Sequence, residues 1–141
     1  MGKEQLKKAT LEALLDRKLQ REQGSYGIKV INVPSLEMSV TAVKQPLSAV
    51  SDILDDLQTG KKMKFSETLD IYKQLIYLCV PLLHDEKLQA AYDCTEPYDV
   101  VTAVLEDNLG AITNLAEAIL GMYGFQDIMD EIKNSSGQTK S

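Results

Sequence analysis

One segment of the chain, from Tyr26 to Lys44, alternates apolar and polar residues, whereas the other apolar residues recur every three or four positions. Such alternation is typical of strands, and Pro34-Ser35-Leu36 in the middle of the segment favours a tight turn. We therefore predict a two-stranded antiparallel hairpin at about residues 27–43. A lone hairpin is marginally stable in water, so it must pack on the helices, on a second copy of the chain, or on a partner.

The rest of the chain has helical periodicity, so the predicted fold class is α+β, predominantly helical, with about five to seven helices packed with this one hairpin. The first helix is expected between Lys7 and Glu22. Its apolar stripe is narrow and includes Lys18; the stripe consists of Leu11, Leu14, Leu15 and Leu19. We expect the helix in segment 1–22 to cover the core from outside, as an amphipathic helix that can be mobile.

A second helix is expected to begin at Pro46 and to end before Gly60, and Ser66 is placed to cap a third. From Leu69 to Leu83, apolar residues cover more than half of the circumference of the third helix. This helix is therefore predicted to form the centre of the fold, and Pro81 is expected to end or kink it.

The remaining helices are short. Asp85 is expected to cap a helix that reaches Tyr92, and Thr95 with Pro97 opens the next one. A break at residues 108–110 separates that helix from another, whose apolar side is formed by Ile112, Leu115, Ala116, Ile119, Met122 and Tyr123. A last weak helix is expected at residues 126–133.

Composition limits the class of protein. A chain of 141 residues with 44% apolar residues suits one globular domain, expected at residues 1–133, and the polar, Ser-rich residues 134–141 suggest a disordered tail. A formal charge of −6 without a dense basic cluster argues against nucleic-acid binding. The start of the chain does not resemble a signal peptide, and the apolar run Leu75–Leu83 is too short for a membrane span, so we expect a cytoplasmic protein.

No sequence pattern points to catalysis, a metal or a cofactor. The single histidine, His84, is followed by Asp85 and Glu86, but Asp85 suits a helix cap better than an acid–base pair. Cys79 and Cys94 with His84 are too few and too far apart for a zinc site, and both thiols are expected to stay reduced. Residues 106–110 have the composition of a calcium loop but lack its ligand spacing, so we predict a plain turn there.

Adaptable and apolar side chains near turns and helix ends are the remaining candidates for function, because flexible or aromatic groups often form protein contacts. The alternative is that most of them simply complete the core. The candidate partner-binding residues are Val30, Val33, Met38 and Val40 in the hairpin, and Met63, Phe65, Met122, Tyr123, Phe125 and Met129 elsewhere.

Several short strings, taken in order, resemble one protein family: the tail assembly chaperones of phages of Gram-positive bacteria and of PBSX-like defective prophages. The resemblance covers roughly residues 11–133. The matching strings are Leu14–Asp16, Ile28–Leu36, Met38–Val43, Val80–Leu88, Pro97–Val101 and Ile112–Leu120.

The resemblance implies a non-enzymatic protein of the bacterial host cytoplasm that keeps the phage tape measure protein soluble while tail tube subunits polymerise around it. Such a protein is absent from the mature virion. The implied partners are the tape measure protein and, second to it, the major tail tube protein, and self-association through the hairpin edge is a further option. The alternative function is a small cytoplasmic helical adaptor or regulatory protein that binds one protein partner.

Overall fold

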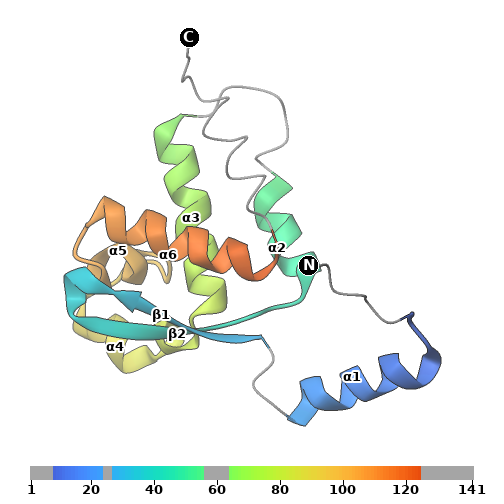
Figure 1. The fold of residues 1–141 in the computed structure, drawn as a ribbon. Coiled ribbons are helices and arrows are strands. Elements are labelled where there is room, and N and C mark those ends of the chain that lie inside the picture. Colours follow the sequence, from blue (N-terminus) through green and yellow to red (C-terminus); the bar gives the residue numbers. More distant parts are fainter. Residues whose placement is uncertain (1–7, 24–26, 56–63, 125–141) are drawn as a thin grey trace.

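The computed structural model describes residues 8–23, 27–55 and 64–124, which form helices around one hairpin (Figure 1). The predicted fold class, α+β and predominantly helical, is confirmed. The predicted helix at 126–133 and the tail at 134–141 lie outside the described residues, as does Gly60 at the expected end of the second helix.

The hairpin consists of strands β1 (Ile28–Val33) and β2 (Met38–Val43), paired antiparallel with Ile28 opposite Val43 and Val33 opposite Met38. Pro34–Leu36 form the short 3-10 helix η1, and Glu37 closes the turn in the left-handed region, with φ of 58°. The predicted hairpin is therefore confirmed, including the turn at Pro34-Ser35-Leu36.

One face of the hairpin packs on the core and the other faces solvent. Ile31, Val33 and Ala42 are buried on the inner face, whereas Ile28 and Val30 are exposed on the outer face. The inner face contacts α6 (Leu109–Met122) through β1 and η3 (Pro81–His84) through β2. The tertiary structure thus settles that the hairpin packs on the helices of its own chain.

Helix α3 (Phe65–Cys79) lies at the centre of the fold, as predicted, and contacts α2 (Leu47–Leu54), α5 (Asp99–Val104) and α6. Its buried residues are Ile71, Tyr72, Leu75, Ile76 and Cys79. The prediction that Ser66 caps this helix is wrong. The N-cap is Lys64, whose backbone N–H donates to the Glu67 carboxylate at 2.9 Å, so Ser66 lies inside the first turn.

Proline and capping side chains determine the later boundaries. Helix α3 ends at Cys79, and Pro81 opens η3. Asp85 caps α4 (Glu86–Ala91) by accepting from the backbone N–H groups of Lys87 and Leu88, which confirms the predicted cap. In the same way, the Asn108 side chain accepts from the Ala111 N–H at the start of α6, so the interhelical turn ends at Asn108, and residues 109–110 of the predicted turn already belong to α6.

Helix α1 (Leu11–Gln23) lies apart from the other helices in Figure 1. Every side chain placed on it, from Leu11 to Glu22, is exposed. The expectation that this helix covers the core is therefore not met. The hydrophobic core is instead formed by the hairpin, α2, α3, η3, α5 and α6.

Candidate partner-binding surface

The residues predicted to bind a partner do not form one patch. Val30 and Met38 are exposed in the hairpin. Phe65 is exposed in the first turn of α3, and this end of the helix lies far from the hairpin in Figure 1. Val33, at 2% exposure, belongs to the core, and Val40 packs partly buried against it. Met63, Phe125 and Met129 lie outside the described residues.

Met122 and Tyr123, two further predicted contact residues, pack partly buried against the core. The Tyr123 hydroxyl accepts from the backbone N–H of Gln45 at 2.5 Å and donates to the Gln45 carbonyl oxygen at 2.8 Å. It also lies 3.9 Å from the Cys79 thiol. Tyr123 therefore ties the end of α6 to the segment between β2 and α2, which is a structural role.

Burial at this junction raises the pKa values of both Tyr123 and Cys79. Burial raises the pKa of Tyr123 to about 12, against the hydrogen bond with the Gln45 backbone, which lowers it. Burial also raises the pKa of the Cys79 thiol, and its contacts with the Tyr123 hydroxyl and the Gln45 backbone partly offset this rise. Both groups are therefore held in their neutral forms, which does not suit a nucleophile.

A stripe of four leucines on α1 was missing from the residues predicted to bind a partner. Leu11, Leu14, Leu15 and Leu19, the α1 leucine stripe, fall on one side of the helix and are all more than half exposed. Lys18, within the stripe, pairs with Glu22 at 2.6 Å. The signal was present in the helical spacing, but the sequence alone suggested that these leucines would cover the core.

The polar residues around His84 are occupied in local structure. His84 Nε2 lies 2.6 Å from the Tyr77 carbonyl oxygen, and its ring lies 4.3 Å from the Tyr77 ring. Gln89 donates to the Leu83 carbonyl oxygen and to the Tyr77 hydroxyl, and Asp85 serves as the helix cap. Among the described residues, no three His, Cys, Asp or Glu side chains come together in a way that could hold a metal.

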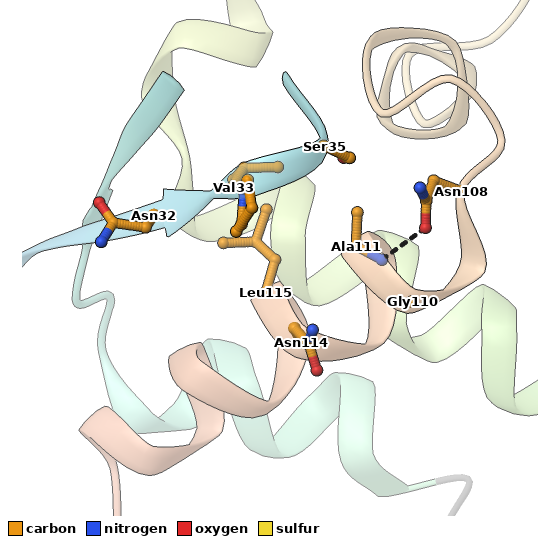
Figure 2. Close-up of a pocket in the computed structure, with 9 residues that line it drawn as sticks. Asn32, Val33, Ser35, Asn108, Gly110, Ala111, Asn114 and Leu115 are labelled. Atoms are coloured by element: carbon orange, nitrogen blue, oxygen red, sulfur yellow. Dashed lines mark hydrogen bonds between the residues drawn. The ribbon is translucent and has the colours of Figure 1, made fainter. Parts of the chain in front are cut away.

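A small open pocket of about 210 Å³ lies between the turn end of β1 and the first half of α6 (Figure 2). Its apolar lining comes from Val33, Ala111 and Leu115, and Figure 2 shows Val33 and Leu115 close to each other. Pro34 and Gly110 also line the pocket, and the polar groups of Asn32, Ser35, Asn108 and Asn114 complete it. The Asn108 side chain points toward α6, where it makes the helix cap, so it is partly committed to structure.

Comparison with known proteins adds no identification, because no protein-family model, curated protein sequence or solved structure matches the chain. Within the described ranges, none of the helices is long and apolar enough to span a lipid bilayer. The described surface thus offers exposed apolar residues on α1 and on the hairpin, which suit contacts with another protein.

Proposed function

We propose that the protein is a non-enzymatic assembly chaperone for phage or prophage tails, acting in the bacterial cytoplasm. Its main partner is the tape measure protein, and the tail tube subunits are a second partner. The family resemblance of the strings between residues 11 and 133 suggests this function. The observation that best supports it is the exposed α1 leucine stripe, because a soluble chain seldom leaves four aligned leucines in water without a partner.

The stripe has the form required to bind an amphipathic helix. Leucines at helical spacing can dock against the apolar side of a partner helix, which then buries both stripes. Fully burying one leucine side chain contributes about 1.5–3 kcal/mol, and the cost of association offsets part of the sum. The formal charge of −6 keeps such a complex soluble while apolar surface is masked.

An adaptor that binds one regulatory partner would use the same stripe. The position of the gene separates the two functions. A reading frame that lies downstream of a tail tube gene and just upstream of a very long coding region favours the chaperone, whereas any other neighbourhood favours the adaptor.

The direct test is co-expression with the tape measure protein encoded in the same gene cluster. The wild-type chain should raise the soluble yield of that protein and should co-purify with it. Leu15→Gln, at the centre of the stripe, should reduce both effects by about tenfold, which corresponds to a loss of about 1.4 kcal/mol of binding free energy.

Ala13→Gln is the matched control, because Ala13 is exposed and lies on the opposite side of α1. It should leave yield and co-purification unchanged. If the wild-type chain does not raise the soluble yield, the chaperone function is excluded. If both variants behave alike, the stripe is not the binding surface.

A further inference from the structure

The hairpin has an edge whose hydrogen-bonding groups can be assigned from its register. The Lys44 backbone N–H donates to the Gly27 carbonyl oxygen, so Gly27 and Lys44 form a hydrogen-bonded pair. Such pairs alternate along an antiparallel ladder, so Val30 and Thr41, which lie opposite each other, are a pair without mutual hydrogen bonds. On β1, the N–H and C=O groups that point away from β2 therefore belong to Ile28, Val30 and Asn32.

Of the usual protections of a strand edge, β1 has only one charged residue, Lys29, near its start. Natural edge strands carry charges or prolines that prevent another strand from pairing, but Ile28, Val30 and Asn32 have neither. All three side chains are exposed, and Val30 is 61% exposed. The three residues whose backbone groups form the β1 edge are thus exposed and uncharged, and Lys29 is the one charged residue of the strand.

The pocket in Figure 2 lies where a strand added to this edge would place its inward side chains. It is lined by Asn32 and Val33 of β1 and by Ala111, Asn114 and Leu115 of α6. A third strand would alternate its side chains like β1, one set outward beside Val30 and the other inward over α6. The apolar part of the pocket suits a small apolar side chain in the inward set.

Charges at the two ends of β1 differ in sign and define the partner further. At the turn end, Glu37 is exposed, and the exposed Glu106 and Asp107 precede the pocket residue Asn108. At the other end, the strand carries Lys29, with Lys44 beside Gly27. A bound strand would therefore be favoured by a basic residue at the turn end and by uncharged residues in between.

We propose that the β1 edge binds an extended segment of a partner protein as a third strand. The segment has small apolar residues facing the pocket, uncharged residues facing outward, and a Lys or Arg at the turn end. A second copy of β1 is the less suitable occupant, because each β1 is already backed by α6, and two such helices would have to share the space beneath neighbouring strands. This inference shares with the proposed function only the assumption that the partner is a protein.

The test uses a capped synthetic peptide that begins with Lys and continues as alternating Val and Thr, so that an antiparallel arrangement places the Lys at the turn end of β1; it is added to the isotope-labelled full chain. Backbone amide signals should shift at Ile28, Val30 and Asn32 and at the pocket residue Ala111. Val30→Pro removes only an edge-facing N–H and should weaken binding by about tenfold or more. Thr41→Pro is the matched control from the opposite strand and should leave binding within about twofold of wild type.

A second measurement avoids any change in the protein. With the peptide antiparallel to β1 and Val facing the pocket, the Thr N–H groups of the peptide face β1, so N-methylation at Thr should abolish binding and N-methylation at Val should not. Shifts confined to other residues, absence of binding, or equal loss in both methylated peptides would each overturn the proposal. If the peptide binds but the chain does not raise the soluble yield of the tape measure protein, only the chaperone function is rejected. If the soluble yield rises but the peptide does not bind, only the strand site is rejected.

Discussion

At the residue scale, the type of a side chain did not determine whether it is buried or exposed, because residues of the same type lie in opposite environments. Val30 and Val33 lie three positions apart on β1, yet the first is 61% exposed and the second 2%. Tyr123 is of a residue type common in protein contacts, but its hydroxyl forms hydrogen bonds with both backbone groups of Gln45. Such long-range pairings have no local signal, so sequence reasoning assigned Val33 and Tyr123 to a binding surface.

Tyr123→Phe is expected to destabilise the fold. The change leaves the N–H and C=O groups of Gln45 without their partner, which costs about 1–3 kcal/mol when such groups are partly buried. Urea unfolding of both proteins at neutral pH measures this loss. Tyr92→Phe is the control, since Tyr92 is 47% exposed, and a loss of equal size there would contradict the role of the junction.

The pKa of Tyr123 adds a pH signature to this prediction. Its folded-state pKa is about 12, above its ordinary value of 10.0, so the fold favours the protonated phenol. The contribution of this group to stability is complete below pH 10.0 and is lost as pH rises to about 12. The stability difference between wild type and Tyr123→Phe should therefore shrink across that interval, and a constant difference would contradict the assignment.

At the element scale, periodicity identified most helices and both strands, and capping residues identified several boundaries. Asp85 caps α4, and Pro81 follows the end of α3, as local chemistry predicts. Ser66 was misassigned because the Glu67 carboxylate accepts from the Lys64 backbone N–H and closes the first turn instead. Which face of the hairpin is buried could not be predicted, because Ile28 and Val30 are as apolar as Ile31 and Val33.

A pair of substitutions on β1 tests that assignment of faces. Val33→Asp should destabilise the fold by several kcal/mol, because it places an unpaired carboxylate in the core. Val30→Asp should change stability by no more than about 0.5 kcal/mol, because its side chain faces water. Thermal or urea unfolding distinguishes the two. Similar losses for both variants would show that the outer face is also covered in solution.

At the scale of the whole molecule, one core joins the hairpin to five helical elements, and α3 is its centre. Leu75, in the middle of α3, is fully buried. Leu75→Ala should therefore cost about 2–5 kcal/mol, through lost burial and the cavity left behind. Because the hairpin and the helices share this core, the far-ultraviolet and near-ultraviolet circular dichroism signals should be lost in one unfolding transition. A hairpin or α6 signal that stays at its wild-type midpoint would contradict a single cooperative core.

The sequence by itself determined the fold class, the hairpin and the central helix, because helical and strand periods and turn chemistry are local properties. Only the tertiary structure decided which apolar residues remain on the surface. The α1 leucine stripe and the outer residues of β1 have the same apolar character as core residues, and they differ only in what packs against them. Burial depends on contacts between distant segments, so the surfaces proposed to bind a partner emerged only once the chain was folded.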